Sequence, residues 1–254
     1  MSQPAIPFRQ RMGDSMRGHT PLVGTTITLP VPELVEIAVG SGFDWLWLDM
    51  EHGLLDVADV QRAAMAAHGT PCLARVPVNN ESWIKRALDT GVDGLIIPQV
   101  NTPELAERAA RFTRYPPLGV RSVGAGRAHG YGKDFDSYNA RANNDLALIV
   151  QIEHVQAVEN LDAILHVTGI DAIIVGPYDL STSMGKPGQL DDPTIRATIA
   201  YILAACKRRL LPAGIYCPDQ AAALRAIQEG FTLITAATDV SVLRGAWNGL
   251  RSGL

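Results

Sequence analysis

The chain has 254 residues, of which 47% are hydrophobic and 19% are charged, and its formal net charge at pH 7 is −4. This length and apolar content are sufficient for one large α/β barrel or for two small domains with a full core. The negative charge provides no general attraction to nucleic acid or to an anionic membrane, so neither is expected as a partner.

The N-terminal sequence and the cysteines indicate a cytoplasmic location. The first residues, MSQPAIPFRQRMGD, lack the continuous apolar segment of a secretory signal, and no apolar run approaches the roughly 18 residues of a membrane span. Cys72, Cys206 and Cys217 are too few and too widely spaced for a disulfide framework or a zinc motif. We therefore expect reduced, buried cysteines in a cytoplasmic protein.

Short apolar runs alternate with amphipathic segments from about residue 22 to the end of the chain. Eight runs have the length and composition of buried parallel strands, and a helical segment follows each one. The expected strands are 22–29, 45–49, 72–76, 94–98, 146–152, 172–175, 213–216 and 233–235. The expected helices are 30–40, 57–67, 81–89, 103–113, 156–165, 193–208, 220–229 and 240–250.

Eight strand–helix pairs without a break in composition predict a single (β/α)8 (TIM) barrel domain over residues 1–254. The alternative is a doubly wound open sheet, but no G-x-G-x-x-G motif follows the first strand. Residues 1–20 are expected to be a polar N-terminal lead. Residues 115–144, rich in Gly, Arg and Tyr, are expected to be a long loop insertion, and a loop of this length is more often functional than idle.

Polar residues follow the strands at the edge where such a barrel carries its active site. The second strand ends in Asp49-Met-Glu51-His52, in which an aspartate three residues before a histidine can orient the imidazole and raise its basicity. A solvated turn is the alternative for this motif alone. Further polar residues at strand ends argue against that alternative, namely Arg75, Gln99, Gln151, Glu153 and Asp179.

Glu153 and Asp179 follow neighbouring strands and offer only carboxylate oxygens. Two carboxylates that leave positions for water suit Mg²⁺ or Mn²⁺, and less specifically Co²⁺ or Zn²⁺; two unrelated surface acids are the alternative. None of the chain's lysines ends a strand, so a Schiff-base aldolase has no candidate lysine, and a carbanion beside a carbonyl would need a metal. Strands seven and eight lack a glycine-rich phosphate-binding turn, which argues against a phosphorylated substrate.

Arg75 and the turn Gly176-Pro177-Tyr178 are candidate anion-binding groups. The guanidinium of Arg75 can form paired hydrogen bonds with a carboxylate or an enolate oxygen, although a salt bridge to Glu153 is an alternative. The turn leads from a strand end into a helix start and so presents free backbone N–H groups to an anion.

Five motifs are specific enough to compare with known families: GFDWLWLDMEHG (42–53), ARVP (74–77), ALDTG (87–91), IVQIE (149–153) and VGPYDLSTSMG (175–185). They resemble the HpcH/HpaI family of metal-dependent (class II) pyruvate aldolases, which includes 4-hydroxy-2-oxoheptanedioate aldolase and 2-keto-3-deoxy-sugar-acid aldolases. The resemblance extends from about residue 24 to residue 250. It implies that Glu153 and Asp179 bind the metal and that Gln151 and Arg75 hold pyruvate. It also implies that the turn beginning at Gly176 contacts the pyruvate carboxylate.

The resemblance further implies an acid–base dyad of His52 oriented by Asp49, and an acid, Asp89, supplied to the site of a neighbouring subunit. The family is a barrel whose eighth helix is exchanged between subunits, usually in a hexamer built as a trimer of dimers. Two residues depart from the family pattern. Tyr216 stands where the family often has a smaller aliphatic residue near the aldehyde pocket, and Ser122 replaces a common glycine. The identity of the aldehyde therefore stays open.

The implied reaction is the reversible cleavage of a 4-hydroxy-2-oxo acid into pyruvate, or a close analogue such as hydroxypyruvate, and an aldehyde through a metal-stabilised enolate. Mg²⁺, Mn²⁺ or Co²⁺ is the expected cofactor. One alternative is a lyase like citrate lyase β that acts on a CoA thioester, for which the loop with Arg121 and Arg127 is the only basic candidate. The other is a non-catalytic binder of 2-oxo acids, which would not need the His52–Asp49 pair.

Overall fold

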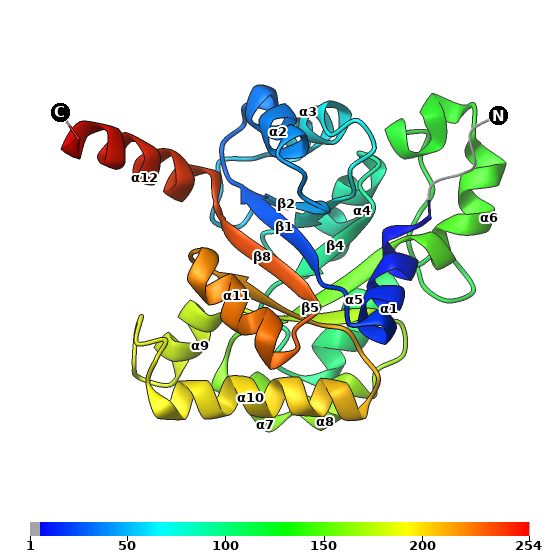
Figure 1. Ribbon diagram of the computed structural model, residues 1–254. Coiled ribbons are helices and arrows are strands. Elements are labelled where there is room, and N and C mark those ends of the chain that lie inside the picture. Colours follow the sequence, from blue (N-terminus) through cyan, green and yellow to red (C-terminus); the bar gives the residue numbers. More distant parts are fainter. Residues whose placement is uncertain (1–5, 254) are drawn as a thin grey trace.

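The computed structural model describes residues 6–253, so the first five residues of the expected N-terminal lead lie outside the described residues. Eight parallel strands close into a barrel in sequence order, with the last strand paired to the first (Figure 1). The strands are β1 (Leu22–Ile27), β2 (Trp45–Asp49), β3 (Cys72–Arg75), β4 (Gly94–Ile97), β5 (Ala147–Ile152), β6 (Ala172–Val175), β7 (Ala213–Cys217) and β8 (Leu233–Thr238). The predicted (β/α)8 barrel is confirmed.

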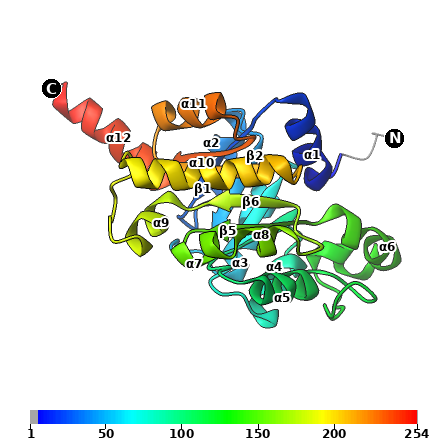
Figure 2. The ribbon, with the colours of Figure 1, turned by 90° about the horizontal axis from the view of Figure 1, so that it is seen from below.

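Helices connect the strands and cover the outside of the barrel; Figure 2 shows α10 and α11 on one side and α3, α4 and α5 on the other. The helices are α1 (Phe8–Gly18), α2 (Pro32–Gly40), α3 (Val57–Ala66), α4 (Glu81–Asp89), α5 (Pro103–Thr113), the 3₁₀ helix η1 (Arg127–Gly132), α6 (Phe135–Asp145), α7 (Val155–Glu159), α8 (Leu161–Leu165), α9 (Pro177–Ser183), α10 (Pro193–Arg208), α11 (Gln220–Glu229) and α12 (Asp239–Ser252). No helix in the described part of the chain combines the length and apolarity needed to cross a bilayer.

Local sequence explains where several of these helices begin. The Asp56 side chain accepts hydrogen bonds from the first backbone N–H groups of α3, and the Asp219 side chain caps α11 in the same way. Proline occupies the first turn of α2, α5, α9 and α10, where its missing N–H costs nothing. These caps and prolines fix the residue at which each helix begins. They therefore also fix the length of the loop between that helix and the carboxyl end of the preceding strand.

Residues 8–18 of the polar N-terminal lead form α1, a helix that the sequence analysis did not predict. Phe8, Met12 and Ser15 recur at helical spacing and are buried. The ring of Phe8 lies 5.8 Å from that of Trp45, inside the barrel, so α1 closes the end of the barrel where the strands begin. The helix was not predicted because only two large apolar residues form the buried face of this otherwise polar segment.

The segment 115–144 is also more ordered than the expected loop, since it contains η1 and most of α6. Its centre is the guanidinium of Arg121, which is only 1% exposed. That group lies 4.6 Å from the ring centroid of Tyr115 and 5.7 Å from that of Tyr138, and it donates to the Asp89 carboxylate at 2.8 Å. The segment is therefore held in place by a buried arginine between aromatic rings. Such contacts leave no periodic pattern in the sequence, so the helices of this segment could not be predicted from it.

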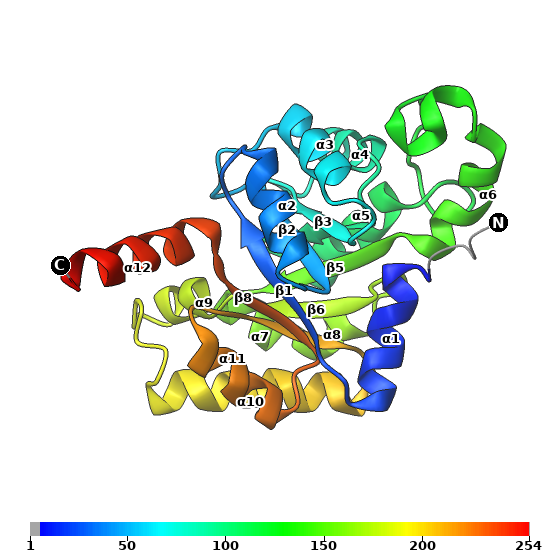
Figure 3. The same cartoon turned by 45° about the horizontal axis from the view of Figure 1, so that its top comes forward.

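Helix α12 differs from the other barrel helices because it extends away from the barrel (Figures 1 and 3). Asp239, its first residue, is its only buried residue among those described, and Trp247 and Leu250 are 67% and 68% exposed. The Asp239 carboxylate accepts hydrogen bonds from the backbone N–H groups of Thr28 and Leu29. The start of α12 is thus fixed to β1, whereas Trp247 and Leu250 farther along the helix stay exposed to solvent.

Candidate active site

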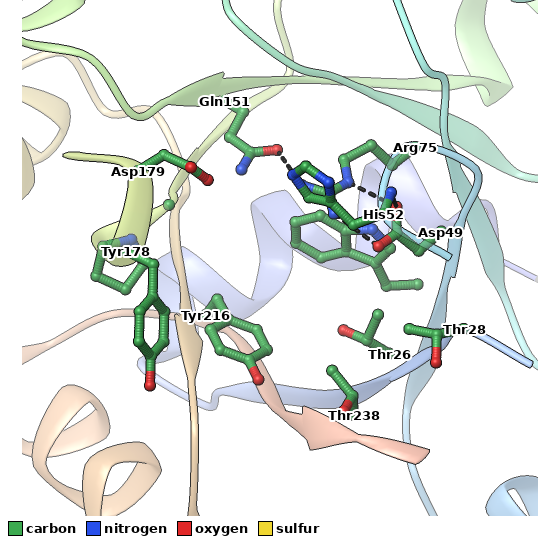
Figure 4. A pocket seen from close by; sticks show the side chains of 13 residues that line it. Thr26, Thr28, Asp49, His52, Arg75, Gln151, Tyr178, Asp179, Tyr216 and Thr238 are labelled. Carbon is green, nitrogen blue, oxygen red and sulfur yellow. Dashed lines mark hydrogen bonds and ion pairs between the residues drawn. The ribbon is translucent and has the colours of Figure 1, made fainter. Parts of the chain in front are cut away.

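A cavity of about 360 Å³ opens at the carboxyl ends of the strands. Figure 4 shows the side chains that face it, from residues far apart in the sequence. Its lining residues are Thr26, Thr28, Trp47, Asp49, His52, Arg75, Gln151, Gly176, Pro177, Tyr178, Asp179, Tyr216 and Thr238. The cavity therefore collects most of the residues that sequence reasoning proposed for the site.

Asp49 and Arg75 form a buried ion pair at the ends of β2 and β3, where the two residues are direct partners in register. Arg75 Nε and Nη2 donate to the two carboxylate oxygens of Asp49 at 2.8 and 2.6 Å. Burial alone would lower the pKa of Arg75, but the hydrogen bonds and charge of Asp49, followed by Glu51 and Glu153, raise it above its usual value. The guanidinium, which also lies 4.9 Å from the ring of Trp47, is therefore a fixed positive charge.

The structure gives Asp49 a different partner from the one expected. Its Oδ1 accepts the backbone N–H groups of Glu51 and His52 at 3.0 and 3.4 Å, in addition to Arg75 Nε. In the described part of the chain, no hydrogen bond joins the Asp49 carboxylate to the His52 ring. Asp49 thus fixes the turn that carries His52 and the side chain of Arg75, because the carboxylate oxygens are already occupied by these donors. The exposed imidazole of His52 reaches the cavity from this turn.

Gln151 connects Arg75 to Glu153. Its Oε1 accepts from Arg75 Nη1 at 3.4 Å, and its Nε2 donates to a Glu153 carboxylate oxygen. The other Glu153 oxygen accepts the backbone N–H of Gln99 at 2.8 Å. Because alternate residues of β5 face the barrel interior, Gln151 and Glu153 point to the same side and extend the buried polar network from Asp49.

The pKa of Glu153 is raised to about 7, chiefly by burial and also by the nearby carboxylates of Glu51 and Asp179, against the lowering effects of the Gln99 N–H and Arg75. The pKa of Glu51 is raised as well, by burial and then by Asp49 and Asp179, although Arg75 and His52 oppose the shift. Several carboxylates therefore repel one another across a small space. A divalent cation between them would relieve this repulsion, so the donor set fits a hard metal ion.

The metal-ligand set in this chain is small. Within residues 6–253, no group of three or more His, Cys, Asp or Glu side chains is arranged to hold a metal ion. A pair such as Glu153 and Asp179 leaves most coordination positions to water or substrate, which is the usual arrangement for Mg²⁺ bound together with a substrate.

Gly176 begins the turn that faces this network, and a side chain does not fit there. A Cβ atom at this position would lie 2.7 Å from Gln151 Nε2 and 2.9 Å from Glu153 Cβ and Oε2. The N–H of Gly176 already donates to Ile152 O at 3.2 Å, and Pro177 has no N–H. The backbone donors of the turn that stay free for an anion are therefore those of Tyr178 and Asp179, in the first turn of α9.

Comparison with known proteins agrees with this site. The sequence profile of the HpcH/HpaI aldolase/citrate lyase family matches residues 27–246. The chain belongs to this family. It is 39% identical over 227 residues to 5-keto-4-deoxy-D-glucarate aldolase of Citrobacter koseri, which covers 88% of each protein, and 34% identical to that of Klebsiella pneumoniae over 94% of each. The protein is therefore an enzyme, a carbon–carbon lyase of the aldolase type.

Solved structures of this family have the same fold. An HpcH/HpaI aldolase/citrate lyase family protein from Burkholderia cenocepacia J2315 superposes with a TM-score of 0.91 at 36% identity, covering 96% of this chain and 98% of the other. An HpcH/HpaI aldolase from Desulfitobacterium hafniense DCB-2 superposes with a TM-score of 0.85 at 29% identity, covering 94% and 95%. The family assignment from the five motifs is thereby confirmed.

Two of the expected site residues, Glu153 and Asp89, do not line the cavity of this HpcH/HpaI barrel. Glu153 is buried directly behind Gln151, to which it is hydrogen-bonded, whereas Asp89 lies far from the cavity. It ends α4, at the opposite end of the barrel from the cavity, and its carboxylate pairs with Arg121 Nη2 at 2.8 Å. Any contribution of Asp89 to a site would be to that of another subunit.

Sequence reasoning missed part of the cavity wall in this family member. Thr26, Thr28, Trp47 and Thr238 line the cavity but were not proposed. The alternation of β1 and β2 could have indicated the direction of Thr26 and Trp47, because Trp47 lies two residues from Trp45 and Thr26 four residues from Leu22, both inside the barrel. Tyr216 was proposed and does line the cavity, with its ring 6.2 Å from that of Tyr178; burial raises the pKa of Tyr216 to about 12.

Proposed function

We propose that this aldolase is metal-dependent and reversibly cleaves a 4-hydroxy-2-oxo acid into pyruvate, or a close analogue such as hydroxypyruvate, and an aldehyde. The main support is that a fixed cation, Arg75, and the Asp179 carboxylate both line one cavity of substrate size, and that the buried Glu153 carboxylate feels the charges of both. The names of the bacterial relatives make a keto-deoxy-sugar acid such as 5-keto-4-deoxy-D-glucarate a candidate substrate.

Glu153 and Asp179 would hold the divalent ion, Mg²⁺, Mn²⁺ or Co²⁺. When bound, the ion would act as a Lewis acid that stabilises negative charge on the 2-oxo acid. The raised pKa of Glu153 supports this assignment, because a buried carboxylate surrounded by other acids gains most from a neighbouring cation.

Arg75 and Gln151 would orient the 2-oxo acid. The Nη1 group of Arg75 is not held by Asp49; it lies 3.4 Å from Gln151 Oε1 and 3.0 Å from Glu51 Oε2. It would donate to the keto oxygen in place of the long contact with Gln151 as negative charge develops there. The backbone N–H groups of Tyr178 and Asp179 would bind the carboxylate, and Gly176 would let the substrate approach the Gln151–Glu153 pair. Asp49 positions Arg75, and this contact explains the need for an aspartate at the end of β2.

His52 would transfer the proton to and from the 4-hydroxyl group during carbon–carbon cleavage and formation. Its exposed ring on a turn fixed by Asp49 supports this role, because it reaches the cavity from the solvent side. The expected dyad is thus proposed in an altered form, in which Asp49 acts on the backbone of His52.

The test measures exchange of the pyruvate methyl protons in D₂O by NMR, without any aldehyde, after dialysis against EDTA. Exchange should stop in EDTA and return with Mg²⁺, Mn²⁺ or Co²⁺. Glu153→Gln should lose exchange by at least about 100-fold, because it removes a metal-binding charge. Glu36→Gln, an exposed acid on α2, is the matched control. Exchange that persists in EDTA would refute the metal-dependent mechanism.

We also propose that the enzyme is a homo-oligomer, with α12 exchanged between subunits and Asp89 close to the site of a neighbour, as in a trimer of dimers. The exposed apolar side chains of α12, Val240, Val242, Trp247 and Leu250, support the exchange.

The alternative function, a lyase acting on a CoA thioester, would need a basic groove, and Arg121 and Arg127 do not form one. Arg121 is buried against Asp89, Tyr115 and Tyr138, and Arg127 donates to the backbone carbonyl of Thr90 at 2.8 Å. Neither guanidinium lies at the cavity, so the geometry favours a small 2-oxo acid.

A further inference from the structure

The guanidinium of Arg75 lies over an aromatic ring inside the barrel. Its central carbon is 4.9 Å from the ring centroid of Trp47, a residue of β2 that is 3% exposed. Trp47 lies two residues before Asp49, so both side chains point to the same side of β2, and Trp47 and Arg75 both line the cavity. The face of an indole ring carries negative charge density and attracts a cation, most strongly where water is excluded.

Three rings form a column below this guanidinium, which we call the aromatic column: Phe8, Trp45 and Trp47. The ring of Phe8 lies 5.8 Å from that of Trp45, and the ring of Trp45 lies 6.5 Å from that of Trp47 at an interplanar angle of 25°. All three residues belong to the core inside the barrel. The column therefore connects α1, at the end of the barrel where the strands begin, with Arg75 at the cavity.

The ion pair with Asp49 holds the guanidinium of Arg75 by one edge. Nε and Nη2 both donate to the Asp49 carboxylate, so the planar group can still tilt about the line that joins these two atoms. Nη1 lies farthest from that line, so a tilt displaces Nη1 most. A ring against the face of the group opposes the tilt, because tilting toward the ring is blocked and tilting away loses the attraction. Nη1 is also the atom that would donate to the keto oxygen.

Tryptophan at position 47 carries a cost that the contact with Arg75 explains. Its indole N–H has no partner within residues 6–253, whereas the N–H of Trp45 donates to Leu22 O at 3.4 Å. A buried donor without a partner costs free energy, and phenylalanine would avoid that cost. Tryptophan supplies instead the ring face that binds a cation best among the aromatic side chains.

We propose that Trp47 is a positioning residue of this aldolase, whose ring fixes the plane of the Arg75 guanidinium so that Nη1 meets the keto oxygen of the 2-oxo acid. This inference rests on the reaction proposed above. It requires that the rate follow the negative charge density of the ring face at position 47, and not only the size of the side chain.

The test replaces Trp47 alone, in the full-length, metal-loaded enzyme, by tryptophans that carry one, two and four fluorine atoms on the benzo ring. Each fluorine withdraws charge from the ring face and nearly preserves its shape. The kcat for pyruvate methyl exchange should fall stepwise, by about tenfold for the tetrafluorinated ring, because a desolvated cation–π contact is worth up to about 30-fold. The KM for pyruvate should change by less than about twofold, since the contact acts as charge develops on the keto oxygen.

The matched control carries the same fluorinated rings at Trp83. This ring lies 5.6 Å from the guanidinium carbon of Arg86, also on α4, and does not line the cavity. Its kcat should stay at the wild-type value. Trp47→Phe and Trp47→Leu form a second series with natural residues, in which phenylalanine keeps a weaker ring face and should retain more of the kcat than leucine.

The inference is overturned by a kcat that is equal for all rings at position 47, or that falls equally with the rings at position 83. Exchange by the unmodified enzyme separates this failure from a failure of the proposed function. If that enzyme exchanges the methyl protons and the series at position 47 is flat, Trp47 does not position Arg75 while the aldolase mechanism stands. If the unmodified, metal-loaded enzyme exchanges no protons, the proposed function is wrong and this inference falls with it.

Discussion

The substitution Asp49→Asn tests whether Asp49 serves mainly to hold Arg75. The wild-type carboxylate accepts two hydrogen bonds from the guanidinium, at 2.8 and 2.6 Å, in a buried position. Asparagine preserves the size of the side chain but removes the negative charge and one acceptor. The buried guanidinium would then keep only Glu51, whose carboxylate oxygen lies 3.0 Å from Nη1, as an ionic partner.

Removing one partner of a buried ion pair typically costs about 3–5 kcal/mol in unfolding free energy. The remaining contact with Glu51 reduces this cost, so we expect about 2–4 kcal/mol for Asp49→Asn. For a chain of this size, each kcal/mol lowers the thermal midpoint by roughly 2–4 °C, which gives a decrease of about 4–16 °C. An exposed pair contributes much less, so Asp14→Asn, which removes the partner of Arg17, should cost below about 1 kcal/mol.

The assay is thermal unfolding followed by circular dichroism, at one protein concentration and in EDTA, together with kcat for retro-aldol cleavage. Asp49→Asn should lower both the midpoint and kcat, because Arg75 loses its orientation. A midpoint within about 2 °C of wild type, combined with a change confined to the pH dependence of kcat, would refute this reasoning. That result would instead indicate that Asp49 acts through the imidazole of His52.

Three further predictions concern the same site and the assembly. Gly176→Ala should abolish detectable cleavage, because its Cβ would lie 2.7 Å from Gln151 Nε2; activity above half of wild type would contradict the close packing. Burial raises the pKa of Glu153 from 4.5 to about 7, so between these values the folded protein retains a proton that the unfolded chain has lost. Stability in EDTA should therefore fall as pH rises through this window, and more steeply than in Glu153→Gln; equal slopes in thermal midpoints would disprove the shift. Trp247→Glu, on the exposed face of α12, should reduce the oligomer size measured by analytical ultracentrifugation, and an unchanged mass would exclude this helix from the interface.

The sequence determined the barrel because each strand and helix has a strong local pattern. The run Trp45–Asp49 is buried along its whole length, and the cap at Asp56 fixes the start of the next helix. Since strand ends meet at one edge of a parallel barrel, the sequence alone could also bring Arg75, Gln151 and Glu153 together. It did not predict α1, whose buried face consists of few residues. It also gave the 115–144 segment as a loop, because the helices there depend on a buried arginine.

Only the tertiary structure decided which side chains within the cavity touch one another. The sequence paired Asp49 with His52 because they are three residues apart, but β2–β3 register places Arg75 beside Asp49, and a bidentate guanidinium takes both carboxylate oxygens. The uncharged part of the cavity lining likewise depends on register between β8, β1 and β2, which makes Thr26 the direct partner of both Thr238 and Trp47. Local sequence sets the direction of a side chain along its own strand, whereas its partners are set by the closure of the barrel.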